Sequence, residues 1–142
     1  MRFLTGGTLD PSFGGGTGKV LTEFPGGESA ATAVLLRHDG RITAVGSAGF
    51  PSVFALAGYL PDGGLDPAFG TCGRTTTAIG ADSGATGAVL QGKGRVVVAG
   101  STFDATLTEG GFALARYLGG TGSGQDVAAG VAAPCPAQAP VR

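Results

Sequence analysis

Short apolar runs alternate with glycine-rich stretches along most of this chain. The runs have the length of β-strands, and most are bounded by Gly, Asp or Pro, which favours strands joined by turns. A helical fold is disfavoured because Gly interrupts nearly every segment long enough to form a stable helix. The pattern predicts strands near residues 19–24, 30–37, 41–47, 53–60, 74–79, 85–91, 95–101 and 111–118.

Three motifs recur in the same order, which indicates two copies of one unit. Leu65-Asp66-Pro67-Ala68-Phe69-Gly70 repeats residues 9–14, residues 112–118 repeat residues 54–60, and residues 94–101 repeat residues 40–47. Arg2-Phe3-Leu4 fits the same frame, as a counterpart of residues 58–60 and 116–118. The frame predicts the end of a preceding repeat and its turn at 1–14, a first repeat at 15–70, a second at 71–118, and a Gly/Ala/Pro-rich, disordered tail at 119–142.

The repeated positions are predicted to have structural roles. Asp-Pro suits a turn capped by the Asp side chain, Asp39-Gly40 and Lys93-Gly94 suit two-residue hairpin turns, and Gly46 and Gly100 would let neighbouring sheets approach. The recurring aromatic residues are expected to pack in the core. These positions are Asp10, Pro11, Phe13, Gly14, Asp66, Pro67, Phe69, Gly70, Gly40, Gly94, Gly46, Gly100, Phe54, Tyr59, Phe112 and Tyr117.

The predicted fold class is all-β. The second and third runs of each unit are apolar on both faces, as expected for strands buried between stacked sheets. Four strands in each unit of about 55 residues indicate antiparallel four-stranded blades of a β-propeller. About two blades would be present, so the propeller would be incomplete or the chain a fragment. A β-sandwich and a parallel β-helix remain alternatives.

The units resemble the delta-60 repeat, a bacterial repeat taken to form β-propellers in long surface or secreted proteins. The resemblance covers roughly residues 2–118 and rests on the segment Tyr59 to Gly70, on Asp39-Gly40-Arg41 and on Val98-Ala99-Gly100. The sequence departs from the pattern at Lys93, where Asp is usual, and after Leu118, where the turn motif does not recur. The resemblance implies no catalytic residues.

Composition and charge limit the classes of partner that we expect for this chain. Ten acidic and nine basic residues give a net charge of −1, which argues against nucleic-acid binding. No apolar run is long enough for a membrane span, and polar residues soon after Arg2 leave no secretory signal, although the resemblance suggests a secreted or cell-surface location. Cys72 and Cys135 have no neighbouring cysteine, so zinc is not expected, and one disulfide between them stays open.

No residue cluster predicts catalysis, a cofactor or a metal. Gly14 to Lys19 resembles a phosphate loop but lacks the required Gly and the Ser or Thr after Lys. Residues 120–126 resemble one degenerate copy of a calcium repeat, which needs several copies. His38, the single His, precedes a hairpin turn and is expected to be exposed. A ring of repeated Asp residues holding a cation is the alternative to turn capping by Asp10 and Asp66.

The expected function is therefore a non-catalytic structural or interaction module, as a fragment of a larger bacterial surface or secreted protein. Its partners would be further repeats of a parent chain, or other copies that cover the open blade faces. A lectin-like propeller assembled from several copies is an alternative, weakened by the absence of Trp. A propeller hydrolase or lactonase is a further alternative, and it would need several converging carboxylates or histidines.

Overall fold

The structure is a computed structural model that describes residues 1–118, and the predicted tail, 119–142, lies outside the described residues. The all-β prediction is confirmed. The strands are β1 (Ser29–Leu36), β2 (Ile42–Ala48), β3 (Val53–Tyr59), β4 (Arg74–Thr77), β5 (Asp82–Gln91), β6 (Arg95–Phe103) and β7 (Gly110–Tyr117), and one 3₁₀ turn, η1 (Gly92–Gly94), joins β5 to β6.

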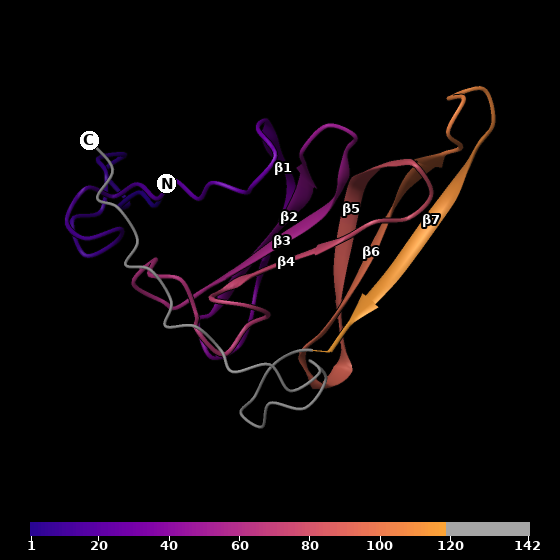
Figure 1. Cartoon of the computed structure of the whole chain (residues 1–142). Coiled ribbons are helices and arrows are strands. Elements are labelled where there is room, and N and C mark those ends of the chain that lie inside the picture. The colour runs from indigo at the N-terminus through magenta and orange to yellow at the C-terminus, as the bar shows by residue number, and fades with distance from the viewer. Residues whose placement is uncertain (119–142) are drawn as a thin grey trace.

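The strands form two antiparallel sheets that pack against each other (Figure 1). One sheet has the order β1-β2-β3-β4 and the other has the order β5-β6-β7, so neither closes on itself. The sheets do not follow the sequence units. Residues 74–77 belong to the second unit, yet they pair with Phe54–Ala57 of β3 and supply the fourth strand of the first sheet.

The strand predicted near residues 19–24 is wrong, because no strand forms there among the described residues. Its counterpart in the repeat frame, β4, takes strand geometry by pairing with β3, the strand before it in the chain. The segment 19–24 is preceded instead by the loop 2–18, which presents no strand of its own. An isolated run of β-prone residues gains little from its propensity without a neighbouring strand.

Corresponding strands of the two sheets pair in the same register, and each sheet has one β-bulge at the same place. β1 and β5 each bulge opposite the following strand, between Ala31 and Ala33 and between Ala85 and Gly87. A Cβ on Gly46 would lie 1.9 Å from the carbonyl oxygen of Ala30, and one on Gly100 would lie 2.0 Å from that of Gly84. These glycines therefore make room for the bulged strand of their own sheet, and their role in close approach between sheets stays a prediction.

The hairpins β1–β2 and β5–β6 have three-residue loops, so the prediction of two-residue turns is wrong. Arg37 N–H donates to the carbonyl of Arg41 at 2.9 Å, and Gly40 N–H donates to the carbonyl of Arg37 at 3.0 Å. Gln91 pairs directly with Arg95 across the loop Gly92–Gly94. Gly40 and Gly94 have φ of 80° and 70°, the left-handed conformation that ends such three-residue loops.

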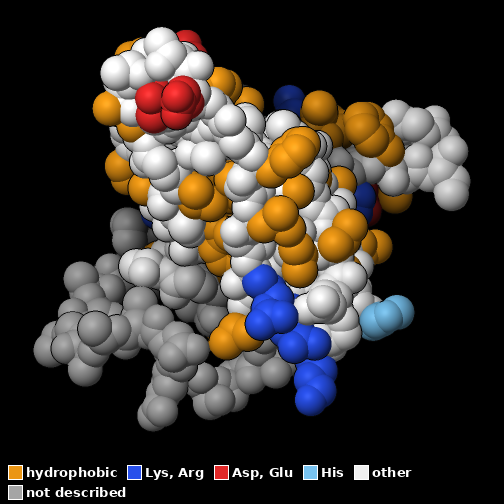
Figure 2. Space-filling model, turned by 90° about the vertical axis from the view of Figure 1, so that its right-hand side faces the viewer, with side chains coloured by type: hydrophobic (Ala, Val, Ile, Leu, Met, Phe, Trp, Pro, Cys, Tyr) orange, Lys and Arg blue, Asp and Glu red, His pale blue; other side chains and the backbone are white. Residues whose placement is uncertain are grey.

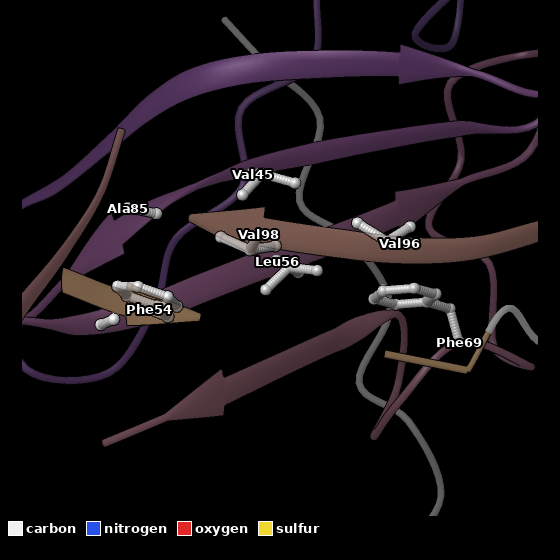
Figure 3. Packing of buried hydrophobic residues seen from close by; sticks show 8 residues of the cluster. Val45, Phe54, Leu56, Phe69, Ala85, Val96 and Val98 are labelled. Atoms are coloured by element: carbon white, nitrogen blue, oxygen red, sulfur yellow. The ribbon is translucent and has the colours of Figure 1, made fainter. Parts of the chain in front are cut away.

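The hydrophobic core lies between the two sheets (Figure 3). Val45, Phe54 and Leu56 point from the β1–β4 sheet, and Val96, Val98, Ala85 and Ala113 meet them from the β5–β7 sheet. Phe69 closes one end of this layer, where it lies over Gly58, at which a Cβ would approach the Phe69 ring carbon to 2.5 Å. The core is therefore an interface between two copies of the repeat.

The N-terminal loop 2–18 reproduces the loop that follows β3. Arg2 N–H donates to the carbonyl of Gly18 at 3.0 Å, as Gly58 N–H donates to that of Gly73 at 2.8 Å. The bridge between Phe3 and Leu9 likewise matches the bridge between Tyr59 and Leu65. Residues 2–18 thus take the conformation of a repeat end, in agreement with the motif frame read from the sequence.

Candidate interaction surface

Asp10 and Asp66 begin equivalent turns in the two loops. Oδ1 of Asp10 accepts the N–H of Ser12 at 2.8 Å, and Oδ1 of Asp66 accepts the N–H of Ala68 at 3.0 Å. The carbonyls of the same two residues accept N–H bonds from Phe13 and Phe69, so Pro11 and Pro67 stand at the second turn position. Each carboxylate thereby fixes a turn that buries a Phe ring.

Gly14 and Gly70 directly follow these buried rings. Their φ values are 63° and 54°, and an added Cβ would lie 2.0 Å from the carbonyl oxygen of Lys19 or 2.3 Å from that of Arg74. Both positions therefore exclude any larger residue. The glycines close the turn by letting the following segment approach it.

The two turn aspartates face different arginines. Nε of Arg2 lies 2.7 Å from Oδ2 of Asp10, whereas Nε of Arg41, from the β1–β2 loop, lies 3.6 Å from Oδ2 of Asp66. Hydrogen bonds from Ser12, and then from Arg2, hold the pKa of the Asp10 carboxyl below its usual value. Both carboxylates therefore take part in a turn hydrogen bond and in an ion pair.

Tyr59 and Tyr117 join each sheet to a segment that comes earlier in the chain. Tyr59 joins the β1–β4 sheet to the N-terminal segment, and Tyr117 joins the β5–β7 sheet to β4. The Tyr59 hydroxyl donates to Oγ1 of Thr22, and the Tyr117 hydroxyl donates to Oγ1 of Thr77, both at 2.8 Å. Burial raises the pKa of both phenols. Thr22 and Thr77 were missed in the sequence, although each lies in the first predicted run of its unit.

Phe54 and Phe112 occupy the same position of the repeat and lie in opposite environments. Phe54 is 0% exposed in the core, while Phe112 is 98% exposed, which contradicts the core role predicted for it. Leu56 and its counterpart Leu114 are 0% and 69% exposed. The strand β7 presents to solvent the side chains that β3 buries.

The side of the β5–β7 sheet that no other described strand covers is an apolar surface, here called the open face. Pairing in register places Val89 beside Val97, Leu114 beside Ala99, and Phe112 beside Ser101 on this side. Figure 2 views the molecule from the β7 side and shows hydrophobic side chains gathered there, with basic side chains toward one end. Such a contiguous apolar surface is typical of an interaction site.

The outer side of the β1–β4 sheet, here called the cavity face, is covered in part by the N-terminal segment. Phe13, Val20 and Phe24 line a half-open cavity of about 380 Å³ together with Ala44, Ala55 and Ala57 of the sheet. Val34 and Ile42 line it as well. The cavity is largely apolar, so it is suited to hydrophobic side chains.

Two further sequence candidates, the loop Gly14 to Lys19 and His38, lie within the described residues. Gly14 to Lys19 forms a closed loop in which Thr17 Oγ1 donates to the carbonyl of Gly14 at 2.8 Å, and no helix follows it. His38 is exposed in the β1–β2 loop. Cys135 and the calcium-like residues 120–126 lie outside the described residues.

Within residues 1–118, no three His, Cys, Asp or Glu side chains are grouped closely enough to hold a metal ion. The same residues contain no helix with the length and apolar character needed to cross a membrane. The two features that stand out are therefore the open face and the cavity face.

No protein-family model, curated protein or solved structure matches the chain.

Proposed function

We propose that this chain is a non-catalytic repeat segment that serves as a structural or interaction module of a larger β-propeller-type protein. The delta-60 resemblance implies a bacterial surface or secreted protein as its setting. One observation carries the proposal: Phe54 and Leu56 are fully buried by the next sheet, whereas Phe112 and Leu114 at the same repeat positions are exposed. A surface with the composition of a core calls for a further sheet to cover it.

The recurrence of the polar contacts supports a structural role for the repeated turn motif. Asp10 and Asp66 form the same turn bonds, and Tyr59 and Tyr117 form the same hydroxyl bond to Thr. A catalytic group is normally placed once, beside a partner that tunes it. Contacts repeated in each unit instead align one sheet with the next.

A tandem chain tests this proposal without a designed linker. Joining Leu118 to Thr5 of a second copy continues the motif in frame, because residues 5–9 then follow Leu118 as residues 61–65 follow Leu60. The first copy's open face would meet the second copy's β1–β4 sheet. Burying Phe112 and Leu114 should raise the free energy of unfolding by about 3–6 kcal/mol relative to the single chain.

The matched control is the same tandem with Phe112→Asp in the first copy alone, which should lose that gain. Urea denaturation followed by circular dichroism measures both chains. A tandem that unfolds at the urea midpoint of the single chain, with Phe112 still accessible, would contradict the module proposal.

A further inference from the structure

The interface between the two sheets supplies a template for a second interface of the same kind. Besides the apolar core, it contains hydrogen bonds between sheets: Thr32 Oγ1 donates to the carbonyl of Ala85, and Ala85 N–H donates to Oγ of Ser47, both at 3.0 Å. These bonds fix the register of one sheet on the other. Any partner that repeats this packing should repeat the bonds.

The open face has residues equivalent to those that the β1–β4 sheet contributes to this interface. In the repeat frame, Phe112 and Leu114 correspond to Phe54 and Leu56. Val89 corresponds to Leu35, and Ala99 corresponds to Val45. The polar positions recur as well, because Thr86 stands for Thr32 and Ser101 for Ser47. Thr86 Oγ1 already reaches the carbonyl of Ala99 at 3.3 Å, as Thr32 Oγ1 reaches that of Val45 at 3.3 Å.

The cavity face has residues equivalent to those that the β5–β7 sheet contributes to this interface. Ala44 and Ala55 stand for Val98 and Ala113, the residues that meet Phe54 and Leu56 in the core. Ala31 corresponds to Ala85, whose carbonyl accepts one inter-sheet hydrogen bond, from Thr32, and whose N–H donates the other, to Ser47. The cavity of about 380 Å³ thus lies over the positions where the template seats a Phe and a Leu side chain.

We propose that copies of this chain associate head to tail, with the open face of one copy seated on the cavity face of the next. Phe112 and Leu114 would enter the cavity, and Thr86 and Ser101 would bond to the backbone of Ala31 in the other copy. The proposal rests on the module function proposed above and names the occupant of its open face. Two different faces meet, so association closes into a ring or grows as an open series, not as a two-fold dimer.

One segment competes with this docking. The backbone bonds of Arg2 and Phe3 match those of Gly58 and Tyr59, whose counterparts at the end of β7 are Arg116 and Tyr117. A seated copy would therefore bring Arg116-Tyr117-Leu118 to the place that Arg2-Phe3-Leu4 of the next copy holds. Arg116 has the same guanidinium as Arg2 and replaces it beside Asp10, so the exchange preserves the ion pair.

The test is sedimentation equilibrium of the full chain over a range of concentrations, compared with two Phe→Asp variants. Phe112→Asp places a charge in the proposed interface and should weaken association by about a hundredfold or more. Phe50→Asp is the matched control, since Phe50 is 92% exposed in the β2–β3 turn and lies on neither face, and it should associate like the parent. Both variants should retain the circular dichroism spectrum of the parent.

A photoreactive phenylalanine analogue at position 112 tests the register. Crosslinks should join it to peptides that contain Ala44 or Ala55 of another copy. Removal of residues 1–4 should strengthen association, because it vacates the place that Arg116-Tyr117-Leu118 takes. A chain that stays monomeric at all concentrations, crosslinks that return to β7, or equal effects of the two Phe→Asp variants would each overturn the proposal. A stabilised tandem beside a monomeric single chain would overturn self-association and leave the module function intact.

Discussion

The strands β3 and β7 have nearly the same sequence and opposite surroundings. Six of the seven residues in 54–60 recur in 112–118, yet β3 is the most buried strand of the molecule and β7 forms a free-standing edge with one open face. The difference comes from position in the stack, because a sheet follows β3 and only solvent covers the outer side of β7 in the described chain. The sequence of a strand determines whether it is suited to burial, and its position among the sheets determines whether it is buried.

Truncation of the two equivalent phenylalanines should have the most unequal effects. Phe54→Ala removes a fully buried ring from between the sheets and should lower the free energy of unfolding by about 3–5 kcal/mol. Phe112→Ala should change it by less than about 0.5 kcal/mol when the chain is dilute and monomeric. Urea denaturation of both variants measures the difference, and equal losses would mean that the two strands do not differ in burial.

The bulge glycines should behave alike in the two sheets. Gly46→Ala and Gly100→Ala each force a Cβ against a backbone carbonyl of the neighbouring strand and should each cost about 1–3 kcal/mol. Gly87→Ala is the control, because nothing lies within 4 Å of its added Cβ and Ala33 stands at the same position of the first unit. If close approach between sheets were the cause, Gly100→Ala alone would be costly, since Gly46 faces the cavity.

Removing either tyrosine hydroxyl should have a smaller and matched effect. Tyr59→Phe and Tyr117→Phe each delete one hydrogen bond to a Thr side chain and should cost about 0.5–1.5 kcal/mol near neutral pH. Burial raises both phenol pKa values above the usual 10.0, so their contribution is complete below pH 10.0 and is lost as the pH rises through the raised pKa.

The alkaline loss of stability should therefore shrink in each tyrosine variant. Thermal melts from pH 7 to pH 11, with absorbance titration of the phenolates, measure it. A phenol that titrates below 10.0 in the folded chain would contradict the buried placement.

Replacing Ser83 should have the smallest effect. Ser83 is fully buried, and its hydroxyl oxygen has no hydrogen-bond partner among residues 1–118, whereas its counterpart Ser29 is exposed. Ser83→Ala should leave the stability unchanged or raise it by up to about 1 kcal/mol, because an unpaired buried hydroxyl has lost its water. Ser29→Ala should be neutral, and a clear loss of stability in Ser83→Ala would mean that the hydroxyl has a partner after all.

The sequence predicted what depends on local pattern. The all-β class and the strands from β1 to β3 and β5 to β7 followed from apolar runs bounded by Gly, Asp and Pro. The roles of Gly46 and Gly100 did not follow, because a bulge is a relation between two strands and leaves no mark in either one. The transfer of residues 74–77 to the first sheet was likewise invisible, since a run of threonines does not say which strand it will join.

The interaction surface was predicted only in part. The aromatic positions were found through their recurrence, but recurrence assigned Phe54 and Phe112 the same environment. Their contrast depends on which sheets surround them, a property of the assembled layers. Thr22 and Thr77 were missed because a hydroxyl partner is fixed by a contact about 40 residues along the chain.

The position of β4 has a practical consequence for cutting the chain. A break at the exposed Pro61–Asp62 bond would leave β3 in one piece and β4 in the other, although the two strands belong to one hydrogen-bonded sheet. The C-terminal piece would thus donate a strand to the N-terminal piece as well as a packed sheet. The molecule has the layout of a split-protein pair, in which two separately expressed halves restore each other through strand complementation.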